Sequence, residues 1–173
     1  VFNQENRNRI REELDLNGKF VVGHVGRFQD MKNHTFLVDI FAEIEKREKK
    51  ARLLLLGEGG KMSEIKEKVA RLNLTDKVLF LGNKTNVSDY YQAMDYFVFP
   101  SLYEGLPGTV VEAQASGLHC LISDTITEEV KLSSMVTMFS LQKEAKEWAE
   151  HILCDQEYER EDTLDIIRNA GFS

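Results

Sequence analysis

Apolar and polar positions follow two alternating periods along most of the chain. Short runs of β-branched and large apolar residues are typical of buried strands, and apolar residues at helical spacing are typical of amphipathic helices. Runs of the first kind predict strands over residues 19–25, 51–57, 77–82, 96–100 and 118–123. Segments of the second kind predict helices over residues 34–50, 61–73, 86–94, 109–117 and 144–153.

This alternation predicts an α/β fold. Strands separated by helical crossovers form right-handed βαβ units, which build a parallel sheet with helices on both faces. We therefore expect a single Rossmann-like, doubly wound domain over residues 19–155, with a leading segment or linker over residues 1–18 and a helical tail over residues 156–173. Ligands bind such sheets at the carboxyl ends of the strands, so chemistry is expected in the loops that follow the strands.

Composition and charge exclude several classes of partner. The chain has 173 residues, of which 42% are apolar and 29% charged, as in ordinary globular proteins. A net charge of −7 argues against nucleic acid or an anionic membrane as a general partner, because both favour a basic surface. No apolar stretch approaches membrane-spanning length, and Cys120 in its apolar run indicates a buried thiol in a reducing compartment. We expect a cytoplasmic protein.

The loop after the first strand carries two cations, Arg27 and Lys32, within the sequence "GHVGRFQDMKNH". Both stand where a strand gives way to a helix, so an anion there would meet two cations and the free amides of a helix start. Arginine offers a planar fork and lysine a point charge, a pair suited to a diphosphate. The alternative, that both are solvated surface cations, stays open at this point.

The loop after the second strand, "LGEGGKM", only partly matches a dinucleotide-binding fingerprint. Gly57 and Gly59 fit the first two glycines, but Met62 stands in place of the third, and the loop follows the second strand instead of the first. The glycines would let backbone approach a ligand, and simple use in a turn is the other interpretation.

The stretch "SLYEGLPGTVVEAQASG", residues 101–117, mixes helix punctuation with a less easily explained carboxylate. Thr109 and Glu112 spell a capping box at a helix start, and Gly117 is a normal helix stop. Glu104 follows a buried strand directly and precedes backbone amides suited to an anion. A carboxylate beside a phosphate repels it, unless the carboxylate faces the hydroxyls of a sugar attached to that phosphate.

Metal and histidine chemistry find little support in the sequence. The four histidines do not cluster with each other or with acids at ligand spacing, and no D-x-D sequence occurs, so no metal site is predicted. His24 lies within the first predicted strand and is interpreted as a core residue with its hydrogen bonds satisfied.

Taken together, three segments resemble the donor-binding, C-terminal half of retaining glycosyltransferases with the GT-B architecture, specifically glycosyltransferase family 4 (group 1). The first loop resembles that family's V-G-R-(x)n-K-N segment, and "EGLPGTVVE" resembles its E-x7-E signature, with Glu104 and Glu112 as the two acids. "VLFLGN…YYQAMDYFVFPSLYEG" resembles the run that leads into it. The Pro107–Gly108 variant suggests the branch that builds capsular or exopolysaccharides.

The resemblance implies a role for each candidate residue. Arg27 and Lys32 would hold the diphosphate and stabilise it as a leaving group, so neither a metal nor a cofactor is expected. Glu104 would face the hydroxyls of the donor sugar, and Glu112 would bind the ribose hydroxyls. The further donor-binding residues are Gly26, Gly57, Gly105, Leu106, Pro107, Gly108 and Thr109.

The implied reaction is transfer of a hexosyl-type sugar from a UDP- or GDP-linked donor, with retention, to a polysaccharide or glycolipid acceptor. In the family an acceptor domain precedes the donor half, so we expect the chain starting at Val1 to be a fragment that binds donor weakly and transfers nothing. The missing half is where peripheral association with the cytoplasmic membrane face is expected. A sugar-nucleotide epimerase of GT-B fold and a non-catalytic α/β binding module remain as alternatives.

Overall fold

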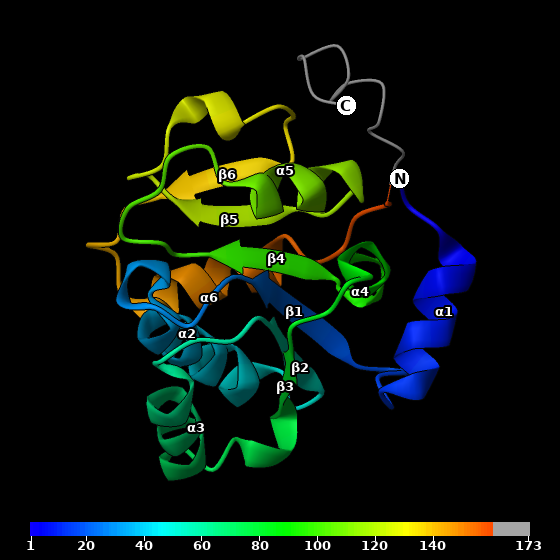
Figure 1. Cartoon of the computed structure of the whole chain (residues 1–173), viewed down its shortest axis with the longest axis horizontal. Coiled ribbons are helices and arrows are strands. Elements are labelled where there is room, and N and C mark those ends of the chain that lie inside the picture. The colour runs from blue at the N-terminus through cyan, green and yellow to red at the C-terminus, as the bar shows by residue number, and fades with distance from the viewer. Residues whose placement is uncertain (161–173) are drawn as a thin grey trace.

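A six-stranded sheet, parallel throughout, forms the centre of the computed structural model, which describes residues 1–160 (Figure 1). Its strands lie in the order β3-β2-β1-β4-β5-β6, so the winding direction reverses between β1 and β4. The bounds of the strands are β1 Phe20–Val25, β2 Ala51–Leu56, β3 Val78–Gly82, β4 Tyr96–Phe99, β5 Cys120–Ser123 and β6 Val136–Phe139. The predicted doubly wound α/β fold is confirmed.

Helices cover both faces of this sheet. One face packs against α2, α3 and α6, and the other against α4 and α5, while α1 lies on α4 at the outside (Figure 1). The bounds of the helices are α1 Gln4–Glu13, α2 His34–Arg47, α3 Met62–Arg71, α4 Val87–Ala93, α5 Gly108–Ala115 and α6 Ala145–Cys154, with short 3-10 turns at Asp30–Lys32, Thr75–Lys77 and Glu128–Val130. In the part of the chain so described, no helix has the length and apolar content needed to cross a membrane.

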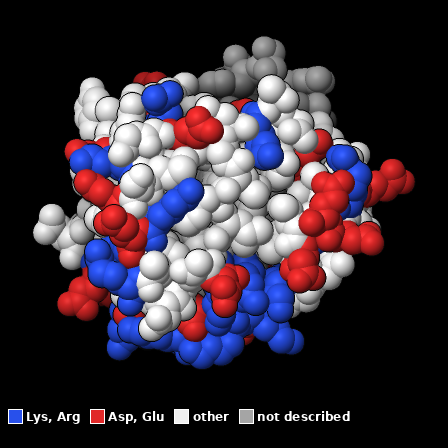
Figure 2. Space-filling view, turned by 60° about the horizontal axis from the view of Figure 1, so that its bottom comes forward, with Lys and Arg blue, Asp and Glu red and all other residues white. Residues whose placement is uncertain are grey.

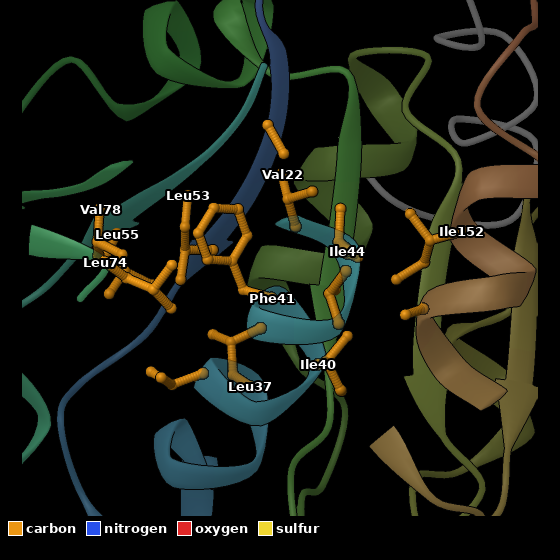
Figure 3. Packing of buried hydrophobic residues seen from close by; sticks show 14 of the residues in the cluster. Val22, Leu37, Ile40, Phe41, Ile44, Leu53, Leu55, Leu74, Val78 and Ile152 are labelled. Atoms are coloured by element: carbon orange, nitrogen blue, oxygen red, sulfur yellow. The ribbon is translucent and has the colours of Figure 1, made fainter. Parts of the chain in front are cut away.

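Helix α2 is fixed against the sheet by one fully buried stripe. Leu37, Ile40, Phe41 and Ile44 recur at helical spacing and point toward the strands (Figure 3). Full burial of such a side chain contributes about 1.5–3 kcal/mol. Since α2 begins at His34, directly after the loop that follows β1, this packing also fixes the far end of that loop.

The leading segment 1–18 contains a helix, α1, that the apolar pattern did not predict. The sequence of α1 carries a single apolar residue, Ile10, and therefore shows no helical stripe. The helix is held by arginine instead: the Arg11 guanidinium is 7% exposed and donates to three main-chain carbonyls at 2.7–2.8 Å. Asp95 binds both Arg11 and Arg7. The segment is therefore part of the folded body.

The end of the domain also differs from the prediction. Strand β6 was not predicted, and residues 156–160 of the predicted helical tail are not helical, while residues 161–173 lie outside the described part. Tyr158 donates to the carbonyl of Asp95, and Arg160 donates to that of Met94 at 2.6 Å. Tyr158 and Arg160 are two residues apart and contact neighbouring carbonyls. Side chains two residues apart lie on the same side of an extended chain but not of a helix, so these contacts do not fit a helix.

Charged side chains are mixed over the surface. On the face in Figure 2, Lys and Arg gather along the lower edge, with acidic side chains beside them. Exposed pairs such as Lys46–Glu43 at 3.0 Å and Lys49–Glu45 at 2.9 Å join neighbouring turns of the chain. Such pairs contribute about 0–1 kcal/mol each, so a cation marks a functional site only where its surroundings are unusual.

Candidate functional site

Two loops meet at the switch point of the sheet, the loop after β1 and the loop after β4. The arrowheads of β4, β5 and β6 point to the left in Figure 1, and the loops at the carboxyl ends lie on that side. The Leu102 amide donates to the Met31 carbonyl at 2.8 Å, and the Asn33 side-chain amide donates to the Pro100 carbonyl at 3.0 Å. These bonds join segments about seventy residues apart in the chain.

Lys32 and Glu104 form an ion pair where these loops touch. The Lys32 ammonium donates to both carboxylate oxygens, at 2.8 Å to Oε1 and 2.7 Å to Oε2. Both side chains are largely withdrawn from solvent, at 17% and 14% exposed. Charge-assisted hydrogen bonds are strong where the groups are withdrawn from solvent. The pair places a cation and an anion at the position where doubly wound sheets bind ligands.

Arg27 has a different environment from Lys32. The residue is exposed, and within residues 1–160 its guanidinium makes no hydrogen bond or ion pair. It borders a pocket of about 190 Å³ at the carboxyl ends of β1, β2 and β3, together with Gly26, Gly57 and Lys84. Two cations beside a pocket, one of them without a protein partner, suit an anionic ligand.

Gly57 lets two loops pack backbone to backbone. Its φ is +127°, and a Cβ there would lie 2.2 Å from the Gly26 carbonyl oxygen. Its amide donates to the Gly82 carbonyl at 2.9 Å. A side chain at Gly57 would therefore push the β1 and β2 loops apart and deform the floor of the pocket that both glycines border.

The predicted capping box at α5 is wrong. The helix begins at Gly108 with Pro107 as its N-cap and has no side-chain capping bond. Thr109 is thus the second helical residue and Glu112 the fifth, too far along the helix to reach the free amides. The Glu112 carboxylate accepts a hydrogen bond from the Tyr91 hydroxyl at 3.4 Å, and partial burial raises the pKa of Glu112.

The start of α5 leaves backbone donors unused. Among residues 1–160, no acceptor contacts the main-chain amides of Gly105, Leu106, Gly108 or Thr109. Gly105, Leu106 and Gly108 are exposed, while Pro107 is buried and anchors the turn. Free amides at a helix start carry a partial positive charge, so this loop can receive an anion or a hydroxyl oxygen beside Glu104.

Two residues that sequence reasoning did not single out, one buried and one half-buried, complete the site. Ser101 is fully buried, and its hydroxyl lies 3.0 Å from Oε2 of Glu104. Asn33, with φ of +62°, joins the two loops through its bond to Pro100. The only signal in the sequence was position, because Ser101 directly follows the proline that ends a buried strand.

Histidines lie beneath the first loop. His24 is fully buried in β1 as predicted and contacts the Val98 carbonyl through Nδ1 at 2.9 Å, but its Nε2 has no partner among the described residues. Burial lowers the pKa of His24 to about 4. His34, at the start of α2, stacks on Phe28 with ring centroids 4.1 Å apart, and burial lowers its pKa to about 2. Both rings are therefore neutral at pH 7, and neither adds to the positive charge of the loop.

Comparison with known proteins shows which proteins this chain resembles in sequence and in fold. EpsF of Bacillus subtilis, a glycosyltransferase by its name, is 45% identical over 135 residues, covering 78% of this chain and 35% of that protein. The C-terminal domain of a glycosyl transferase group 1 family protein, LpcC of Francisella tularensis, has a TM-score of 0.77 at 18% identity, covering 97% of this chain and 94% of that domain. Anabaena HepE, solved in complex with UDP-glucose, has a TM-score of 0.80 at 23% identity, covering 97% and 47%.

These matches agree on the fold and on its extent. The chain spans about a third of the length of EpsF and somewhat less than half of HepE. It covers nearly all of a structure that is itself a C-terminal domain. Residues 19–154 match the family described as glycosyl transferases group 1, and this chain belongs to that family.

Proposed function

We propose that this chain is the domain that binds a nucleotide-diphosphate sugar in a retaining glycosyltransferase. One observation carries the proposal: the Lys32–Glu104 pair lies at the switch point of the sheet, beside the unused amides that open α5. The cation suits the phosphates of such a donor, and the carboxylate suits its sugar hydroxyls. The free amides suit the leaving group, which gains negative charge.

In this proposal Arg27 and Lys32 hold the diphosphate. Arg27 has no competing partner within residues 1–160, whereas Lys32 has to share its ammonium between Glu104 and the phosphate. As the bond to the sugar breaks, negative charge grows on the leaving phosphate, and both cations stabilise it. That stabilisation takes the place of a bound metal ion.

The remaining donor contacts follow from the same loops. Glu104 accepts hydrogen bonds from sugar hydroxyls, and the amides between Gly105 and Gly108 meet sugar and phosphate oxygens. Glu112 binds the ribose, and Gly26 and Gly57 border the pocket. The UDP-glucose held by HepE supports a UDP-linked donor, and a GDP-linked donor is the alternative.

The acceptor chemistry belongs to the rest of a longer protein. The Pro107–Gly108 variant and the resemblance to retaining glycosyltransferases support transfer of a hexosyl group to a polysaccharide or glycolipid, with retention at the anomeric carbon. We place the acceptor domain outside this chain, the full-length protein in the cytoplasm, and any peripheral contact with the cytoplasmic membrane face on that other domain.

A thermal-shift panel of UDP, GDP and their sugars tests the proposal. A ligand at 100 times its dissociation constant stabilises the folded state by about 2.7 kcal/mol, so a donor nucleotide should raise the unfolding temperature clearly. Adenosine diphosphate at the same concentration controls for general effects of a diphosphate. A chain that responds to none of them is a non-catalytic module, and product analysis of the full-length protein separates a transferase from an epimerase.

A further inference from the structure

We infer that Ser101 is the positioning residue for Glu104: its buried hydroxyl fixes which carboxylate oxygen is presented to the donor sugar. This rests on the proposed function of Glu104. The Ser101 Oγ atom lies 3.0 Å from Oε2 of Glu104, and the serine is fully buried. It therefore contacts the carboxylate from the protein side, opposite any ligand that arrives from solvent.

The single hydroxyl hydrogen of Ser101 has three acceptors within reach. They are the carbonyls of Met31 at 2.9 Å and Tyr103 at 3.1 Å, and the Glu104 carboxylate. Each of these oxygens can accept more than one hydrogen bond, and the charged carboxylate is a stronger acceptor than either carbonyl. The hydrogen consequently belongs to Glu104.

Ser101 is itself held in place by the next loop of the sheet. The hydroxyls of Ser123 at 2.5 Å and Thr125 at 3.0 Å both donate to the Ser101 carbonyl. These two residues lie at and just after the end of β5, and neither contacts Glu104. The loops after β1, β4 and β5 thus converge on one buried serine, which leaves its hydroxyl little freedom.

This arrangement distinguishes the two oxygens of Glu104. Within residues 1–160, Oε2 is bound by both Lys32 and Ser101, whereas Oε1 is bound by Lys32 alone. When Lys32 turns toward a diphosphate, Ser101 continues to hold Oε2 and Oε1 becomes free. Oε1 is then the oxygen that accepts a sugar hydroxyl, in an orientation set from inside the protein.

Calorimetry of the chain with UDP and with UDP-glucose separates positioning from general damage. Ser101→Ala should weaken UDP-glucose binding roughly tenfold, the lower end of the range for a hydrogen bond to a charged group, and UDP binding less than twofold. Ser116→Ala is the matched control, because it removes a buried hydroxyl at the C-terminal end of α5, where Ser116 bonds Gln92 and neither Ser101 nor Glu104. It should change neither affinity more than twofold.

Glu104→Gln separates a failure of the inference about Ser101 from a failure of the proposed function. If it weakens UDP-glucose selectively while Ser101→Ala behaves like Ser116→Ala, the inference about Ser101 is overturned and the role of Glu104 stands. If Glu104→Gln leaves the ratio of the two affinities unchanged, or if the wild type binds neither ligand, the proposed function fails first. A crystal structure of the Ser101→Ala variant with UDP bound gives a second test: with Lys32 on the diphosphate, the Glu104 carboxylate should rotate away from its position in the wild-type UDP complex, and an unchanged carboxylate contradicts the inference.

Discussion

At the scale of single residues, Arg27 and Lys32 have the same proposed ligand but different partners in the protein. Each should therefore affect ligand binding alike and folding stability differently. Arg27→Ala and Lys32→Ala should each weaken binding of a nucleoside diphosphate by about 1.5–3 kcal/mol, the value of a hydrogen bond to a charged group. Isothermal calorimetry measures this loss, with the exposed Lys50→Ala as control. Unchanged affinity in both variants refutes the phosphate assignment.

Chemical denaturation of the same variants shows the difference between the two residues. Arg27→Ala should change the free energy of unfolding by less than about 0.5 kcal/mol, because its guanidinium has no partner within residues 1–160. Lys32→Ala should cost about 1–3 kcal/mol, because it leaves the mostly buried Glu104 carboxylate without a cation. Adding Glu104→Gln to Lys32→Ala should recover part of that loss, since the unpaired charge is then removed.

Burial of His34 makes stability depend on pH in a defined window. Burial lowers the pKa of His34 in the folded chain to about 2, below the ordinary histidine value of 6.5, so between these pH values the unfolded chain binds the additional proton. Stability therefore falls as pH drops below 6.5. Between pH 7 and pH 5, wild type should lose about 2 kcal/mol more than His34→Phe, a variant that keeps the aromatic stacking. Urea denaturation at both pH values measures this, and equal losses would show that His34 is not held neutral.

At the scale of elements, α1 tests whether arginine can replace an apolar stripe in docking a helix. Arg11 is buried and satisfies three carbonyls and Asp95, whereas Arg9 on the same helix is exposed and makes a 3.3 Å pair with Asp89. Arg11→Met should lower the free energy of unfolding by about 3–5 kcal/mol, because it leaves Asp95 and the three carbonyls without this donor. Arg9→Ala should cost less than about 1 kcal/mol. If thermal denaturation shows that Arg11→Met costs as little stability as Arg9→Ala, α1 contributes little to the fold.

Elements with an apolar pattern could be predicted from the sequence, and elements held by other forces could not. The buried stripe of α2 gave a clear period, and the runs that became β1 and β2 are almost continuously apolar. Helix α1 has one apolar residue and is fixed by hydrogen bonds to distant carbonyls, which no local pattern encodes. The capping box failed because α5 has Pro107 as its N-cap, two residues before the predicted N-cap Thr109, and the fixed φ of proline is compatible with that position.

At the scale of the whole molecule, the site depends on the strand order, which makes β1 and β4 neighbours in the sheet. Lys32 and Glu104 are 72 residues apart in the sequence, and their contact requires β1 and β4 to be neighbours. The motifs singled out these residues as candidates, and the predicted parallel sheet placed them in loops at the carboxyl ends of its strands. Neither predicted that the two would bind each other, since the sequence holds no information on side-chain rotamers at a loop contact. The buried support from Ser101 was missed for the same reason.

The whole molecule also sets the limit on what this chain can do alone. The residues proposed for the donor lie within it, but the chain spans about a third of EpsF, and transfer needs an acceptor positioned at the anomeric carbon. We therefore expect the chain to bind UDP or GDP sugars and to release no nucleotide from them faster than the Glu104→Gln variant. A coupled assay for released UDP over many hours, with that variant as the control for contaminating enzymes, measures the rate. Turnover by the wild-type chain that disappears in Glu104→Gln would mean that these residues carry out the reaction without a second domain.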